Sequence, residues 1–65
     1  MELIHEFRNG NKWAQIHSFK GEFLITCFKD QVFQGEKTIR NHSEQYAEDT
    51  AENYVLGIWD FGDEQ

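Results

Sequence analysis

The fold is decided by residues 12–29, which read KWAQIHSFKGEFLITCFK. Two runs of aromatic and branched residues flank Lys20-Gly21, and such runs are typical of β-strands. The glycine supplies the positive φ that a tight hairpin turn requires. A two-residue loop at this point sets Phe19 opposite Glu22 and fixes the register of the whole pair. The stretch therefore predicts an antiparallel hairpin at the centre of the chain.

Turn signals on both sides extend this hairpin to four strands. Asn9-Gly10-Asn11 precedes it and Lys29-Asp30-Gln31 follows it, and Asn-Gly between apolar runs is the strongest short hairpin signal. The expected strands are residues 3–8, 12–19, 22–28 and 32–40, which form a meander over residues 1–40. Gly35 interrupts the fourth run and predicts either a β-bulge or the end of that strand.

The segment 43–57 carries the pattern of one amphipathic helix, expected from about Ser43 to Leu56. Two N-caps compete, Asn41 in a capping box with Glu44 and Ser43 by itself. Gly57 is expected just after the helix. One side of the helical wheel gathers most of the apolar residues, namely Tyr46, Ala47, Thr50, Ala51, Tyr54, Val55 and Ile58.

These elements predict one α+β domain over all 65 residues: a four-stranded antiparallel meander followed by one C-terminal helix packed on one sheet face. An acidic, aromatic tail occupies residues 58–65. The single cysteine makes no intrachain disulfide, and no signal peptide or long apolar run is present. We therefore expect a cytoplasmic chain that does not enter a membrane.

Both faces of the predicted sheet carry large apolar side chains. One face holds Ala14, Ile16, Phe23, Ile25 and Cys27, with Leu3 and Phe7 added by a four-residue first turn. The other face holds the expected interface residues Trp13, His17, Phe19, Leu24, Phe28 and Phe33, together with Ile4. A shift of one residue in the first hairpin exchanges the assignments of its first strand.

One helix about 21 Å long covers one face of such a sheet and leaves the other bare. Monomers rarely expose an apolar patch of several hundred Å², and the simplest cover is a second copy around a twofold axis. We therefore expect a homodimer. Two alternatives stay open: the tail from Trp59 to Phe61 folds across the second face, or that face binds another macromolecule or ligand.

Charge is divided unevenly along the chain. Residues 1–42 hold all six basic side chains and five acids, whereas residues 43–65 hold seven acids and no Lys or Arg, for a net charge of −6. Four of these acids form an acidic surface on the predicted helix, namely Glu44, Glu48, Asp49 and Glu52. This surface predicts either a solvated helix face or a mimic of nucleic acid that blocks a basic host protein.

Single-stranded nucleic acid is a further alternative partner for the aromatic face. Trp13, Phe19 and Phe28 would stack on bases. The cations of this reading lie near the turns, namely Lys12, Lys20, Lys29 and Lys37. The acidic net charge and the absence of an RNP-type motif argue against this partner, since nucleic-acid binding surfaces are basic.

The sequence contains no catalytic constellation. The histidines His5, His17 and His42 show no HxxxH, CxxC or HExxH spacing, and Cys27 lies in a predicted strand core. Paired helix acids on a solvated face lack the burial or close partner that general acid–base catalysis requires. We therefore expect a non-catalytic interaction protein with no cofactor and no bound metal.

Two segments of the acidic half carry a resemblance. Residues 43–49, SEQYAED, and residues 51–57, AENYVLG, follow the meander. Together they resemble small β-meander-plus-helix proteins of marine tailed phages and metagenomes. The resemblance implies a short accessory protein of phage type that acts in the bacterial cytoplasm, and it implies no functional residues.

Overall fold

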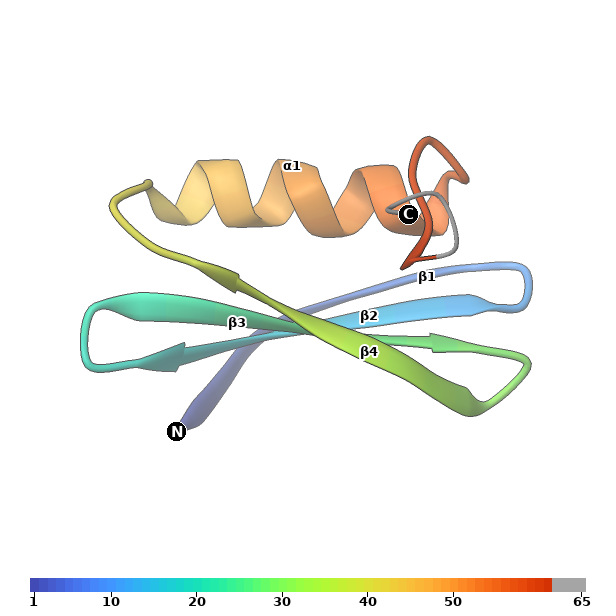
Figure 1. Cartoon of the computed structure of the whole chain (residues 1–65), viewed down its shortest axis with the longest axis horizontal. Coiled ribbons are helices and arrows are strands. Elements are labelled where there is room, and N and C mark those ends of the chain that lie inside the picture. Colours follow the sequence, from blue (N-terminus) through green and yellow to red (C-terminus); the bar gives the residue numbers. More distant parts are fainter. Residues whose placement is uncertain (62–65) are drawn as a thin grey trace.

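The computed structural model describes residues 1–61 and confirms the α+β fold. Its four strands are β1 (Glu2–Asn9), β2 (Lys12–Phe19), β3 (Glu22–Lys29) and β4 (Val32–Ile39). They form one antiparallel sheet in the order β1-β2-β3-β4, and α1 (Glu44–Val55) lies across one side of it (Figure 1). We call this side the covered face and the opposite side the open face. Residues 62–65 of the predicted tail lie outside the described part.

The central hairpin has the predicted register. Phe19 pairs with Glu22 across the loop, and Ile16 pairs with Ile25. Lys20 and Gly21 both have positive φ, 51° and 79°, as a primed turn requires. The turn residues alone therefore set the pairing of β2 with β3.

The first and third turns meet at the same end of the sheet and are bonded to each other. The backbone N–H of Asp30 donates to the carbonyl oxygen of Asn11 at 2.9 Å. In return, Nδ2 of Asn11 donates to Oδ1 of Asp30 at 3.0 Å. These bonds tie two hairpins that are separate in the sequence, and they stiffen this end of the sheet.

Helix α1 begins and ends at local signals. Ser43 is the N-cap, and its Oγ accepts from the backbone N–H of Tyr46 at 3.3 Å. Asn41 instead has a φ of 61° outside the helix, so the capping box with Glu44 is wrong. At the other end Gly57 has a φ of 84°, and the N–H groups of Gly57 and Ile58 donate to the carbonyls of Tyr54 and Asn53. This is a Schellman ending, which satisfies the last helix carbonyls.

The core lies between α1 and the covered face. Ala47 and Ala51 are fully buried, and their small side chains let the helix approach the strands closely. The other buried residues are Ala14, Ile16, Ile25, Cys27, Ile39, Tyr54 and Val55. The hydroxyl of Tyr54 donates to the carbonyl oxygen of Phe28 at 3.2 Å, so the largest core residue also has a polar partner.

A β-bulge in β1 overturns two predicted positions. Leu3 pairs with His17 and His5 pairs with Ile16, so Ile4 is the extra residue of the bulge. Leu3 therefore belongs to the open face, whereas Ile4 packs against the core, which is the reverse of the expectation. The expectation was wrong because strict alternation does not allow for an inserted residue, although Phe7 stays on the covered face as predicted.

The aromatic tail packs beside α1 on the covered face. Nε1 of Trp59 donates to the carbonyl oxygen of Thr50 at 2.8 Å, and Nζ of Lys12 bonds Oδ2 of Asp60 at 3.2 Å. The ring of Phe61 lies directly on Gly35, where a β-carbon would come within 3.0 Å of it. The alternative in which the tail from Trp59 to Phe61 crosses the second face is therefore wrong.

Gly35 lies beside a β-bulge, which is one of the two alternatives that the sequence leaves open, and the strand continues beyond it. Cys27 pairs with Gly35 and Phe28 pairs with Phe33, so the register shifts by one residue between these pairs. The bulge and the missing side chain together make room on β4 for the tail. Helix and tail thus share one face, and within residues 1–61 nothing covers the other.

Candidate functional site

The candidate functional site is the open face. The register places all six expected interface residues there: Trp13, His17, Phe19, Leu24, Phe28 and Phe33. Their side chains form rows across the strands, because residues that pair in register point to the same side of a sheet. Three rows have distinct chemistry, and each is described in turn.

The first row is a ladder of rings at the end where the first and third turns meet. It runs Arg8, Trp13, Phe28, Phe33 from β1 to β4. The Arg8 guanidinium lies 4.2 Å from the Trp13 ring centre, and Trp13 stacks on Phe28 at 4.6 Å between centroids. Phe33 meets Phe28 edge to face at 6.0 Å. We call these four residues the aromatic ladder.

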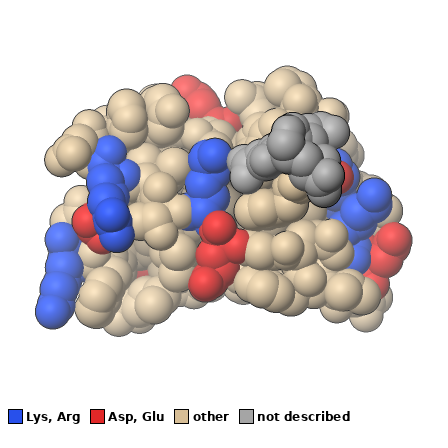
Figure 2. Space-filling view, viewed as in Figure 1, with Lys and Arg blue, Asp and Glu red and all other residues tan. Residues whose placement is uncertain are grey.

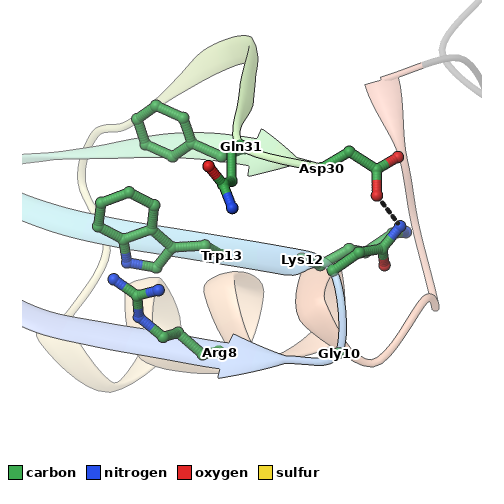
Figure 3. A pocket seen from close by; sticks show the side chains of 8 residues that line it. Arg8, Gly10, Lys12, Trp13, Asp30 and Gln31 are labelled. Atoms are coloured by element: carbon green, nitrogen blue, oxygen red, sulfur yellow. Dashed lines mark hydrogen bonds between the residues drawn. The ribbon is translucent and has the colours of Figure 1, made fainter.

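A hollow of about 340 Å³ opens beside the aromatic ladder. It is lined by Arg8, Trp13 and Phe28 and by the turn residues Asp30 and Gln31. Figure 3 shows Arg8 and Trp13 lying side by side from neighbouring strands, with Gln31 above them. Since the ladder holds its rings in place without a partner, the hollow is formed in the free chain.

The second row is polar and crosses the middle of the face. It consists of Glu6, Gln15, Thr26 and Glu36. Oε1 of Glu6 accepts from Nε1 of Trp13 at 3.1 Å and from Nε2 of Gln15 at 3.3 Å. The sequence analysis did not identify this row, although strict period-two spacing from the ladder residues would have found Glu6, Gln15 and Thr26.

The third row alternates apolar and polar side chains and runs Leu3, His17, Leu24, Thr38. Beyond it lie Phe19 and an ion pair in which Nε of Arg40 is 3.0 Å from Oε2 of Glu22. His17 Nδ1 is buried without a hydrogen-bond partner among the described residues. The open face thus has an aromatic end, a polar middle and an end where apolar and polar side chains mix.

Exposure separates this face from the core. Leu3, Phe19 and Phe33 expose 45%, 48% and 54% of their surface. Trp13, His17, Leu24 and Phe28 are half-buried by their neighbours within the row. These side chains shelter one another along the row, but nothing in residues 1–61 closes over them.

The two other proposed partners find less support in the geometry. Lys37 lies on the covered face beneath the tail, 5.3 Å from the Trp59 ring, so it does not flank the aromatic face. Lys12 lines the hollow beside the aromatic ladder, but its amino group bonds Asp60 of the tail. Trp13 lies between Arg8 and Phe28, which occupies the ring surfaces that a base would stack on. In Figure 2, Lys and Arg side chains are spread along the molecule with Asp and Glu among them.

The acidic surface lies on α1 as expected. Glu44, Asp49 and Glu52 are exposed and Glu48 is half-buried. Within this set the carboxylates do not act alike, because Asp49 accepts from Gln45 while Glu44 and Glu48 converge on a histidine.

That histidine is His5 of β1, and the sequence analysis missed the cluster. Nε2 of His5 lies 3.2 Å from Oε2 of Glu48 and 3.7 Å from Oε2 of Glu44. One ligand atom from each residue lies within 4.8 Å of the other two. The residues are far apart in the sequence, and only the spacing of the two acids by four on a helix hinted at a shared site.

Cys27 and Tyr54 are the groups whose protonation the fold changes most clearly. Burial raises the pKa of the Cys27 thiol to about 12, and the Asp60 carboxylate adds to the effect. Burial also raises the pKa of Tyr54 to about 12. A thiol in this state is a poor nucleophile, because the thiolate is the reactive form. Cys27 therefore packs in the core as a small apolar residue.

Comparison of the chain with protein-family models, curated proteins and solved structures finds no match. In the part of the chain that the structure describes, no helix has the length and apolar character needed to cross a bilayer. The function is therefore inferred from the geometry of the surfaces.

Proposed function

We propose that the chain is a small, non-catalytic interaction module that pairs with a second copy of itself through the open face. One observation carries the proposal: α1 and the tail both pack on the covered face, and exposed apolar side chains remain on the other. A domain of this size also gains stability from association, because its own core is small.

The size of the open face suits a weak dimer. Strands of eight residues at about 3.3 Å per residue, set about 4.8 Å apart, give a face of roughly 500 Å². Two such faces bury roughly 1,000 Å², which is the lower end for specific interfaces. We therefore expect a dissociation constant in the micromolar range, which corresponds to a binding free energy of about −8 kcal/mol.

The open face carries charges of both signs. Glu22 pairs with Arg40, and Glu6 accepts from Trp13 and Gln15. Arg8 on β1 and Glu36 on β4 form no ion pair within residues 1–61. They lie on opposite edge strands.

A twofold axis parallel to the strands places β1 of one copy opposite β4 of the other. Glu36 of each copy then lies opposite the row of Glu6 in its partner and one row away from Arg8, so Arg8 has to reach across one row to offset the repulsion between the two carboxylates. Charge complementarity of this kind selects the partner and the orientation more than it adds affinity.

Sedimentation equilibrium tests the proposal with two matched variants. Phe33→Glu places a charge on the open face, and Leu56→Glu places the same charge beside α1, at residues exposed by 54% and 56%. We expect the native chain and Leu56→Glu to dimerise at about 100 µM. We expect Phe33→Glu to stay monomeric, since a buried unpaired charge is costly. A monomeric native chain, or equal behaviour of the variants, would contradict the proposal.

Charge reversal tests the orientation. Arg8→Glu is expected to weaken the dimer, because it places a third carboxylate near Glu36 of the partner, and the added substitution Glu36→Arg is expected to recover most of the lost affinity. A double variant that dimerises as weakly as Arg8→Glu would exclude this orientation and leave the dimer itself standing.

On the resemblance of residues 43–57 we further propose that the module acts as a phage-type accessory protein in the bacterial cytoplasm. A basic host protein is the partner expected for the acidic surface on α1, while the open face is engaged by the second copy.

A further inference from the structure

We propose that His5, Glu44 and Glu48 bind one zinc-class divalent transition-metal ion where β1 passes the first two turns of α1. The three residues come from two elements, and we call them the His5 cluster. It lies on the covered side of the sheet, so it is separate from the open face and does not depend on dimerisation.

The distances between the ligand atoms fit a small coordination sphere. Ligand atoms at 2.0–2.2 Å from a tetrahedral zinc ion lie about 3.3–3.6 Å apart. Nε2 of His5 is 3.2 Å from Oε2 of Glu48 and 3.7 Å from Oε2 of Glu44. A small rotation of the glutamate side chains therefore brings all three atoms to coordination distance.

The fold holds both halves of the cluster in position. The bulge at Ile4 sets His5 opposite the core residue Ile16, and this turns its imidazole toward α1. Ser43 fixes the start of the helix, so Glu44 and Glu48 stand one turn apart on the same side. Sites built on strands and helices hold ligand geometry better than sites on loops.

The ligand set selects the class of metal. Zinc takes imidazole nitrogens and carboxylate oxygens, and three protein ligands leave a further position for water, whereas calcium takes six to eight oxygens. His5, Glu44 and Glu48 expose 42%, 53% and 24% of their side chains, so an ion and its water can enter from solvent. The two glutamates repel each other, and a dication between them relieves that repulsion.

The competing occupant is a proton, since protonated His5 would pair with the same two carboxylates. Titration of the untagged full chain with zinc chloride at pH 7.5 separates the two. We expect one zinc ion per chain, a thermal midpoint that rises with zinc and falls back on adding a chelator, and NMR shifts at the His5 imidazole protons.

Matched variants locate the site. His5→Ala and Glu48→Gln are expected to lose at least tenfold in zinc affinity. His42→Ala and Glu52→Gln, which change the same residue types outside the cluster, are expected to bind as the native chain does. Phe33→Glu is also expected to bind, because the site lies within one chain.

Two kinds of result would overturn the proposed zinc site, one from the titration and one from the variants. If zinc neither raises the thermal midpoint nor shifts the NMR signals of the His5 imidazole protons, the cluster binds a proton and no metal. Binding that survives His5→Ala, or that is lost in Phe33→Glu, places the metal elsewhere and excludes this site.

Discussion

The two faces of the sheet carry comparable apolar side chains but pack them in different ways. On the covered face, Ala14 and Ala47 are fully buried, and their small size lets α1 and the strands interlock. On the open face, large rings lie beside one another along a row, with Trp13 stacked on Phe28 and flanked by Arg8. Contacts between the helix and the sheet exclude water from the side chains of the covered face. Contacts between neighbouring side chains within a row hold the rings of the open face in place but leave them exposed to solvent.

This difference separates stability from recognition. Side chains that are held in place before binding lose little conformational entropy on binding. The aromatic ladder is therefore suited to contact another surface, whereas the covered face is already buried beneath α1 and the tail. The same contrast suggests four experiments, in order of expected effect.

The largest effect is expected from a pair of neighbouring substitutions in β3. Ile25 is fully buried on the covered face and Leu24 is half-buried on the open face. Ile25→Ala should cost about 2–5 kcal/mol, because it leaves a cavity. Leu24→Ala should lower the free energy of unfolding by about 1 kcal/mol or less, because in the monomer the side chains around Leu24 are already in contact with solvent. Urea unfolding of both in the Phe33→Glu background measures this, and equal losses would remove the distinction between the faces.

The tail contact on Gly35 comes next. Gly35→Ala brings a β-carbon within 3.0 Å of the Phe61 ring at a φ of 156°, and we expect a loss of about 1–3 kcal/mol. Gly10→Ala is the control, since its φ is 60° and no atom lies within 4 Å. Only Gly35→Ala should change the fluorescence of Trp59. An unchanged Trp59 signal would mean that the tail does not complete the covered face.

The helix cap gives a smaller effect. Ser43→Ala removes the oxygen that accepts from the Tyr46 N–H and should cost about 1 kcal/mol. Ser43→Gly should cost only a few tenths of a kcal/mol, because glycine leaves that N–H open to water. Thermal unfolding followed by circular dichroism ranks the variants. Should both behave alike, the cap would not be what holds α1 and its acids in place.

The smallest effect at neutral pH is a proton linkage. The folded pKa values of Cys27 and Tyr54 are raised to about 12 from 9.0 and 10.0. The folded state then holds these protons more tightly, so their contribution is complete below about pH 9 and is lost as pH rises toward 12. Urea unfolding from pH 7 to 11 should show falling stability, and Tyr54→Phe should flatten the slope. A rise in stability over this range would reverse the assigned sign.

The candidate sites differ in how far the sequence reveals them. The six open-face residues can be predicted from the alternation of side chains along a strand and from the Lys20-Gly21 turn, which sets the strand register. The His5 cluster needs β1 and α1 to be set side by side, and no local pattern reports that. The polar row is an intermediate case. The register places most of its residues together, but a search for apolar faces does not single out polar positions.

The sequence by itself determined the elements whose signals are local. The Lys20-Gly21 turn set the register of β2 and β3, Gly35 marked an irregular position in β4, and Gly57 ended the helix. Tertiary structure alone decided the bulge at Ile4 and the side on which Trp59 and Phe61 pack. Turns and caps depend on backbone torsions of adjacent residues, whereas these choices depend on which distant surface has room for a side chain.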